Sequence, residues 1–229
     1  MTGDADRSHR PAPPRRRDAR RNWDLLVGAA REVFAEQGLE APLDVIARRA
    51  GVGNATLYRN FPTRAALIDA VFHDLLTGTM TAGEEARTAP DAWTALNAYL
   101  QAVFVTLAAD RGTNDLMTTH LQGIEALQTV HAHNRETMEI LLSRGREQGT
   151  VRPDATTEDV LFALAALGRA IPALTTATTP ESWRRPLTLL LDGLRASRTT
   201  SPLPPPALTP TQLADVLTEL GPHRAHPPL

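Results

Sequence analysis

The sequence has 229 residues, of which 42% are apolar but only 4% aromatic, so aliphatic packing must dominate any core. It contains no cysteine, which excludes a disulfide framework, a thiol nucleophile and a thiolate metal site. We find no secretory signal and no apolar run of membrane-spanning length, so the composition predicts a soluble cytoplasmic protein with no membrane partner.

Charge is distributed unevenly along the chain. Residues 1–64 contain 12 arginines and 8 acidic residues, whereas residues 65–229 contain 12 arginines and 18 acidic residues. All 24 basic residues are arginine, as a GC-rich genome would produce, but that bias does not explain where they lie. A basic front joined to an acidic body indicates that the front binds a polyanion such as nucleic acid.

The first predicted elements are short and helical. Residues 1–20 are rich in arginine and proline without apolar periodicity, so we expect a disordered basic arm there. From Trp23 onward, apolar residues recur at helical spacing until Gly38 supplies a stop. A second short helix is predicted over 43–50, and a glycine-containing turn leads to a third helical segment over 54–61.

Longer helices are predicted next. Thr63 can cap a fourth helix whose apolar face reaches Leu75, and the helical spacing of apolar residues is weaker over 77–90. An apolar stripe then predicts a helix over 93–107, which we expect to stop near Gly112.

The remaining body helices have clear start signals. Apolar spacing predicts a longer helix over 124–142. Thr156 and Asp159 have the spacing of a capping box, which predicts the start of the following helix. Thr179 and Pro180 are a cap and first-turn pair for the last body helix.

Two short helices joined by a three- or four-residue turn with glycine are typical of the helix-turn-helix unit, whose second helix enters the DNA major groove. Gly51 suits the left-handed position that ends the first helix, and Gly53 lies where the second helix needs its N-cap. On that second helix only Leu57 and Phe61 are strong core candidates.

The other side chains of this helix are expected to face outward, where they can read base edges or contact phosphates. Arg48, Arg49 and Arg64 flank the helix where phosphates would pass. An ordinary solvated helical hairpin is the alternative that the residues alone leave open. The outward-facing set is Asn54, Ala55, Thr56, Tyr58, Arg59 and Asn60.

Residues 22–76 resemble the N-terminal domain of the tetracycline-repressor (TetR) family of bacterial transcriptional regulators. The matching pieces are "NWDLLVGAAREVFAEQGLEAPLDVIARRAGV" and "NATLYRNFPTRAALI", in the family's order and at its spacing. The chain departs from the family's frequent residues at Pro42, Gly53 and Asn60, where threonine, serine and histidine are common.

The resemblance implies roles for individual side chains and for the whole protein. It implies phosphate contacts for Tyr58 and Arg64, and base-facing positions for Asn54, Ala55, Thr56 and Arg59. It also implies a homodimer that holds a palindromic double-stranded DNA operator and represses until a small-molecule effector binds its C-terminal domain.

No segment shows sustained period-two alternation, so the predicted fold class is all-α, with a three-helix helix-turn-helix domain joined to a helical ligand-binding and dimerisation domain. The last 31 residues hold 8 prolines and should be mostly loose. A short amphipathic helix within them either docks on the body or stays free. The predicted divisions are 1–20 (basic arm), 21–76 (helix-turn-helix domain), 77–198 (regulatory domain) and 199–229 (tail, with the helix near 210–220).

Two features of the body predict its functions. Small residues (Ala163, Ala166, Gly168, Ala170) on a helix at about 156–172 and leucines (Leu187, Leu190, Leu191, Leu194) on a helix at about 180–197 can form a four-helix dimer interface. Apolar side chains over 91–149, with Thr118 and Asn134 as polar anchors, can line an effector cavity, although aliphatic stripes are commonly just core. The candidate cavity residues are Leu100, Phe104, Met117, His120, Leu121 and Met138.

Other kinds of site find little support. His131 and His133 are two residues apart on a helix and so point to different faces, which argues against a metal site. We see no glycine-rich phosphate loop and no Ser/His/Asp arrangement, so the sequence predicts neither an enzyme nor a bound cofactor or metal. Two alternatives stay open: a helical small-molecule-binding protein without DNA function, and a ligand-independent DNA-binding protein whose C-terminal domain only dimerises.

Overall fold

The computed structural model describes residues 16–118, 124–197 and 201–220. These described residues form ten helices and no strand, which confirms the all-α prediction. The helices are α1 (Arg16–Gln37), α2 (Leu43–Arg49), α3 (Asn54–Asn60), α4 (Arg64–Thr88), α5 (Ala92–Ala109), α6 (Arg111–Thr118), α7 (Glu125–Glu147), α8 (Thr157–Ala177), α9 (Arg184–Leu194) and α10 (Pro210–Leu220).

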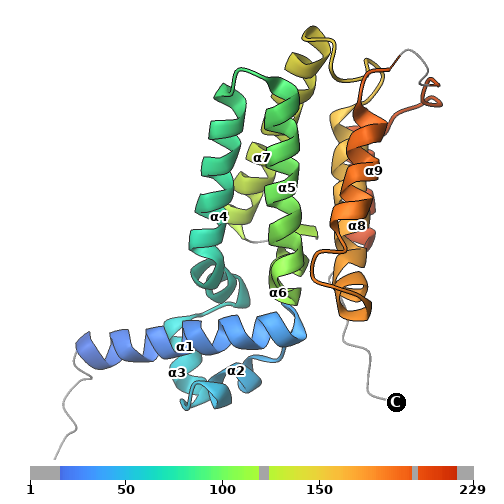
Figure 1. The fold of residues 1–229 in the computed structure, drawn as a ribbon. Coiled ribbons are helices and arrows are strands. Elements are labelled where there is room, and N and C mark those ends of the chain that lie inside the picture. The colour runs from blue at the N-terminus through green and yellow to red at the C-terminus, as the bar shows by residue number, and fades with distance from the viewer. Residues whose placement is uncertain (1–15, 119–123, 198–200, 221–229) are drawn as a thin grey trace, which may run out of the picture.

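The first three helices form a small unit beneath an upright bundle. Helix α1 lies across the foot of the bundle, with α2 and α3 below it, while α4, α5, α7, α8 and α9 run roughly along the long axis (Figure 1). The aliphatic and aromatic core of this unit, in which Leu26, Phe34, Ile46 and Leu57 are fully buried or nearly so, continues into α4, α6 and α7. Helix α4 joins the two parts, because its first turns complete this core and its later turns pack on α7.

Two predicted boundaries fall inside helices of the structure. Helix α1 begins at Arg16, so residues 16–20 are helical and not part of a loose arm; no proline follows Pro14 to prevent it, and arginine and alanine are good helix formers. Residues 1–15 lie outside the described residues. Helix α4 runs unbroken through the division expected at 76/77, and the hydroxyls of Thr77, Thr79 and Thr81 donate to carbonyls four residues back in the same helix.

The body is built on a second core shared by α5, α7, α8 and α9. Helices α5 and α8 are long and apolar enough to span a membrane by length and composition alone, contrary to the sequence expectation. Both pack against neighbouring helices of the bundle. The capping box that opens α8 is confirmed, since Thr156 Oγ1 accepts from the Asp159 amide and the Asp159 carboxylate accepts from the Thr156 amide.

Helix α9 starts later than predicted. Thr179 and Pro180 belong to a turn, in which the Thr179 amide donates to the Ser182 hydroxyl, and α9 begins only at Arg184. The leucine face of this helix was predicted to be available for a dimer interface. That prediction is wrong for three of its leucines, which are buried in the chain's own core: Leu187, Leu191 and Leu194.

Helix α6 was not predicted from the sequence. It begins where the preceding helix was expected to stop, near Gly112. Gly112 lies inside this helix and lets it approach α1 closely, because a Cβ there would fall 2.8 Å from the carbonyl oxygen of Phe34. The buried face of α6 is largely polar: Thr113, Asn114, Asp115 and Thr118 are all buried. An apolar-spacing test cannot detect such a helix.

The polar residues of α6 tie three parts of the fold together. The side-chain amide of Asn114 donates to the carbonyls of Leu107 in α5 and Gly168 in α8, each at 2.8 Å. The Asp115 carboxylate accepts from the backbone amide of Leu39, in the loop between α1 and α2, at 3.1 Å. Helix α6 therefore fixes how the N-terminal unit sits on the body.

Replacing Asp115 with asparagine should loosen this attachment, because an amide oxygen is a weaker acceptor than a carboxylate. We expect faster hydrogen exchange at the Leu39 amide, and a free energy of unfolding lower by about 1–2 kcal/mol. Asp110→Asn is the matched control, since Asp110 caps the same helix through Thr113 without contacting Leu39. Unchanged exchange at Leu39 in the Asp115 variant would contradict this account.

Candidate nucleic-acid interface

The turn between α2 and α3 has the geometry that its glycines predict. Gly51 adopts φ = 69°, a left-handed conformation in which a side chain would be strained, and its amide donates to the carbonyl of Arg48 at 3.1 Å. Gly53 is the N-cap of α3 in an extended conformation, and its carbonyl accepts from Thr56 and Leu57. The chain therefore reverses sharply and starts α3 at a fixed angle to α2.

Helix α3 is held from one side only. Leu57 is buried under α1, and Phe61, which follows the helix, is buried and lies with its ring centroid 6.0 Å from that of Trp23. Four of the predicted outward side chains are exposed: Asn54, Ala55, Tyr58 and Arg59. Thr56 and Asn60 are half-buried, and the Asn60 amide donates to the Thr56 carbonyl at 2.8 Å, so Asn60 is engaged within its own helix.

Arg64 has a structural partner that the sequence did not reveal. Its guanidinium donates to the carbonyls of Leu39 and Ala41 at 2.6 and 2.7 Å, and the side chain is half-buried. These bonds clamp the loop between α1 and α2 onto the start of α4. Any phosphate contact by Arg64 would be additional to this role.

The two arginines at the end of α2 differ in their surroundings. Arg49 bridges to Glu32 and Glu36 of α1 at 3.2 and 3.0 Å, so it braces α2 against α1. Hydrogen bonds from Arg49 lower the pKa of the Glu36 carboxyl from its ordinary value. Arg48 is exposed and pairs only one helical turn back, with Asp44 at 3.0 Å.

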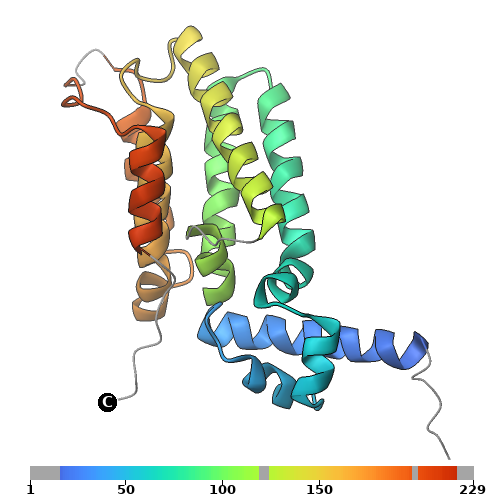
Figure 2. The same ribbon diagram turned by 180° about the vertical axis from the view of Figure 1, so that it is seen from behind.

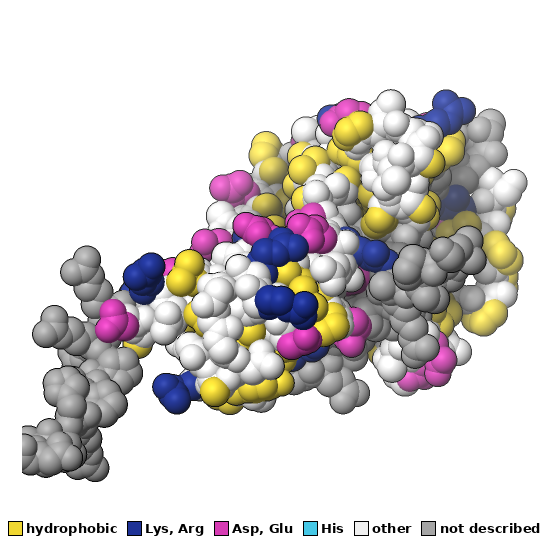
Figure 3. Space-filling view, turned by 90° about the horizontal axis from the view of Figure 1, so that it is seen from below, with side chains coloured by type: hydrophobic (Ala, Val, Ile, Leu, Met, Phe, Trp, Pro, Cys, Tyr) yellow, Lys and Arg dark blue, Asp and Glu magenta, His cyan; other side chains and the backbone are white. Residues whose placement is uncertain are grey.

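The underside of the molecule carries alternating charges. Figure 3 shows arginine side chains interspersed with acidic ones on this face, with no continuous basic patch among the residues described. Within the part of the chain that the structure describes, Arg59 has no carboxylate within ion-pair distance, unlike Arg48 and Arg49. A polyanion approaching α3 would thus meet the unneutralised charge of Arg59 beside the exposed Tyr58 hydroxyl.

A helix-turn-helix held on an all-helical body defines the class of a bacterial DNA-binding regulator. Residues 26–71 match the family described as "Bacterial regulatory proteins, tetR family", and residues 91–196 match "Transcriptional regulator SbtR-like, C-terminal domain". The chain is 31% identical to the TetR transcriptional regulator SCO0520 from Streptomyces coelicolor, over 76% of this chain and 99% of that one, with a TM-score of 0.50. This chain belongs to the TetR family of transcriptional regulators.

Two further relatives extend the comparison. A TetR-family regulator from Agrobacterium tumefaciens shares the fold, with a TM-score of 0.60 at 15% identity over 78% of this chain and 100% of that one. The uncharacterized HTH-type transcriptional regulator YvdT of Bacillus subtilis is 32% identical over 90 residues, which is 36% of this chain. That match spans only 44% of the length of YvdT.

The body contains a partly open cavity of about 370 Å³, lined by residues of α5, α6, α7, α8 and α10. Of the residues proposed from the sequence, Met117 and Met138 line it, whereas Leu100 and Phe104 are fully buried elsewhere in the core. His120 and Leu121 lie outside the described residues. The expected polar anchors Thr118 and Asn134 both face the cavity.

Several walls of this cavity consist of residues that the sequence did not indicate. Tyr99 and Val103 of α5, Leu161 and Leu164 of α8 and much of α10 contribute to it. Helical spacing identifies the apolar face of a helix, but it does not say which neighbour that face will meet. Among the described residues, no cluster of His, Asp and Glu could hold a metal ion.

Arg64→Ala should lower the free energy of unfolding by about 1–3 kcal/mol, because two largely buried carbonyls lose their donor. Arg48→Ala is the matched control and should change it by about 0–1 kcal/mol, since its ion pair with Asp44 is exposed. Urea denaturation of both variants measures the difference. Equal stabilities for the two variants would show that the clamp contributes nothing.

Proposed function

We propose that this chain is a cytoplasmic, ligand-responsive repressor that binds a palindromic operator as a homodimer. The observation that carries the proposal is the outer face of α3 in a TetR-family fold. Asn54, Tyr58 and Arg59 are exposed there together, on a helix whose position is fixed by Leu57 and by the Gly51 turn. A small-molecule-binding protein without DNA function would have no use for such a face.

The proposed roles follow from chemistry and exposure. Arg59 can donate two hydrogen bonds to a guanine edge, and Asn54 can read an adenine or reach a phosphate. The Tyr58 hydroxyl and the exposed Arg48 are suited to phosphates, with Arg64 contributing through any donor beyond its loop contacts. Ala55 and Thr56 present small groups near the helix start, where a thymine methyl can approach.

A homodimer is supported by the outer faces of α8 and α9. Phe162 and Leu189 are 41% and 65% exposed, although both are large apolar side chains. Ala166 and Ala170 follow Phe162 along the same stripe of α8 and are exposed too, so another helix could pack closely there. One helix-turn-helix covers only a half-site, so two copies related by a two-fold axis would match a palindrome.

A route for ligand response is supported by α6. Met117 and Thr118, at its C-terminal end, line the cavity, and Asp115 in the same helix holds the loop between α1 and α2. A ligand that shifts this short helix would therefore move the N-terminal unit relative to the body. The cavity favours this reading over a regulator whose C-terminal domain only dimerises.

Changes on α3 should affect operator binding selectively. The operator is first obtained by sequencing DNA fragments selected by the purified protein. Arg59→Ala should then cost about 1–3 kcal/mol of binding free energy and relax the preference at one base position, whereas Tyr58→Phe should weaken binding to all sequences. Arg184→Ala, which removes the same charge from the body helix α9, is the control. Equal affinities for all variants, measured by fluorescence anisotropy, would refute the role of this helix.

Breaking the proposed dimer face should separate the copies. Leu189→Asp places a charge on that face and should convert the protein to a monomer at micromolar concentration, with weaker operator binding. Val105→Asp is the matched control, since Val105 is a similarly exposed apolar residue on α5. Analytical ultracentrifugation reads the outcome, and a dimer retained in the Leu189 variant would place the interface elsewhere.

A further inference from the structure

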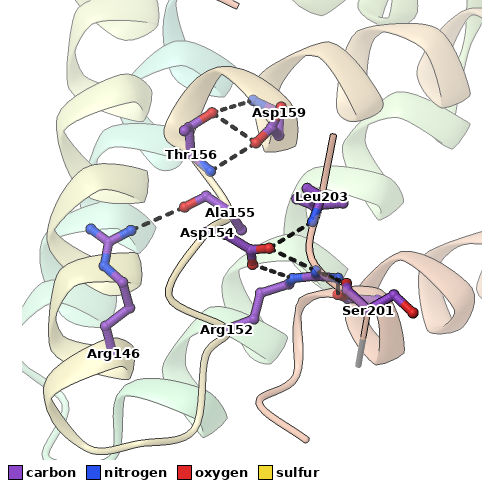
Figure 4. Close-up of polar contacts among 9 residues, drawn as sticks. Arg146, Arg152, Asp154, Ala155, Thr156, Asp159, Ser201 and Leu203 are labelled. Atoms are coloured by element: carbon purple, nitrogen blue, oxygen red, sulfur yellow. Dashed lines mark hydrogen bonds and ion pairs between the residues drawn. The ribbon is translucent and has the colours of Figure 1, made fainter. Parts of the chain in front are cut away.

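The tail that follows α9 is fastened to the body before it reaches α10. The Arg152 guanidinium donates to the Ser201 carbonyl at 2.7 Å, and the Leu203 amide donates to the Asp154 carboxylate at 2.8 Å (Figure 4). Arg152 and Asp154 also pair with each other at 2.6 Å. Hydrogen bonds from Arg152 and from the Leu203 amide lower the pKa of Asp154 well below its ordinary value, so its carboxylate stays ionised.

Helix α10 then runs back along the bundle and packs against α8. In Figure 2 it is the red helix in front of α8, on the side opposite α9. Leu213 anchors it, with only 1% of the residue exposed. Thr209 and Gln212 cap its start, with the Gln212 amide donating to Thr209 Oγ1 at 3.2 Å.

This helix forms one wall of the cavity in the body. Pro210, Leu213, Ala214 and Leu217, one face of α10 over two turns, all line the space between α5, α7 and α8. Without α10 the cavity would be an apolar groove open to water. The match to the SbtR-like C-terminal domain ends at residue 196, so this wall lies beyond the part of the chain that matches the family.

The other walls define what the cavity can hold. Its lining is mainly aliphatic. Of its basic lining residues among those described, Arg135 is paired with the carboxylate of Glu158, and His131 lies near it on α7. The Tyr99 hydroxyl donates to Asn134 Oδ1 at 2.9 Å, and burial raises the pKa of Tyr99 to about 12, so this phenol stays protonated. Because its oxygen is used in this way, Asn134 has its NH₂ group to offer a ligand.

We propose that α10 is a lid that completes the effector site, and that the site takes a neutral, mostly apolar molecule with a hydrogen-bond acceptor for Asn134. This inference rests on the proposed ligand response and names its site and ligand class. A net charge on the ligand is disfavoured because the Arg135 guanidinium is already paired with Glu158 and most of the remaining wall, which also includes His131, is apolar. Since ligand and α10 share the cavity surface, each stabilises the other's bound state.

The lid can be tested with the full-length protein and a neutral probe. Prodan, an apolar naphthalene with a ketone acceptor, changes its emission when it leaves water. We expect it to bind the unsubstituted protein and to bind Leu213→Asp about 10-fold more weakly, because one apolar wall is lost. Thr218→Asp adds the same charge to the outer face of α10 and should bind prodan as the unsubstituted protein does.

The same titrations test the ligand class. Anilinonaphthalene sulfonate, an anionic probe of similar size, should bind more weakly than prodan, and Asn134→Ala should reduce prodan binding. Tighter binding of the anion would overturn the neutral class. Equal prodan affinity in the Leu213 and Thr218 variants, or no prodan binding by the unsubstituted protein, would overturn the lid and its site.

Coupling between ligand and lid can be measured separately by thiol reactivity. The chain contains no cysteine, so an introduced thiol is the only one that reacts. A thiol placed by Leu213→Cys should react slowly with a disulfide reagent, and more slowly still with prodan present. Thr218→Cys, on the exposed face, should react quickly in both conditions. Prodan that leaves the Leu213→Cys rate unchanged would refute the coupling. None of these measurements involves DNA, so failure of operator binding would be recognised separately.

Discussion

The short helix α6 determines how the DNA-binding unit is presented, and it does so with buried polar groups. Asn114 spans the carbonyls of α5 and α8, and Asp115 holds the amide of Leu39. A buried polar group that loses its partner costs roughly 1–3 kcal/mol, so these bonds favour one arrangement where a purely apolar contact would tolerate sliding. Gly112 adds to this constraint, because any side chain there would collide with the backbone of α1.

The elements that sequence reasoning predicted and those it missed differ in what they bury. Helices with aliphatic faces were placed well, and so were the start of α4 at Thr63 and the turn at Gly51, whose signals are local. Helix α6 was missed because its buried face is polar and only tertiary partners make it stable. The Thr179–Pro180 pair suits a turn as well as a helix start. Here the hydrogen bond from the Thr179 amide to the Ser182 hydroxyl stabilises the turn.

In the candidate sites, too, features set by local sequence could be predicted and features set by tertiary partners could not. The outward face of α3 could be predicted because Leu57 and Phe61 define which side is buried. The structural roles of Arg49 and Arg64 could not, because their partners lie 13 to 25 residues away in sequence. In the cavity, spacing identified apolar stripes but not their neighbours. Leu100 therefore turned out to be core, while α10, beyond a proline-rich segment, supplied a wall.

The energies involved are compatible with control of DNA binding by the cavity. Lowering operator affinity 100-fold requires a ligand to favour the non-binding arrangement by about 2.7 kcal/mol. A single hydrogen bond to a charged group contributes about 1.5–3 kcal/mol, so loss of the bond between Asp115 and Leu39 is a change of the required size. Met117 and Thr118, two and three residues further along the same helix, line the cavity. A displacement there reaches Asp115 within one helical turn, so no long chain of coupled residues is needed between the two sites.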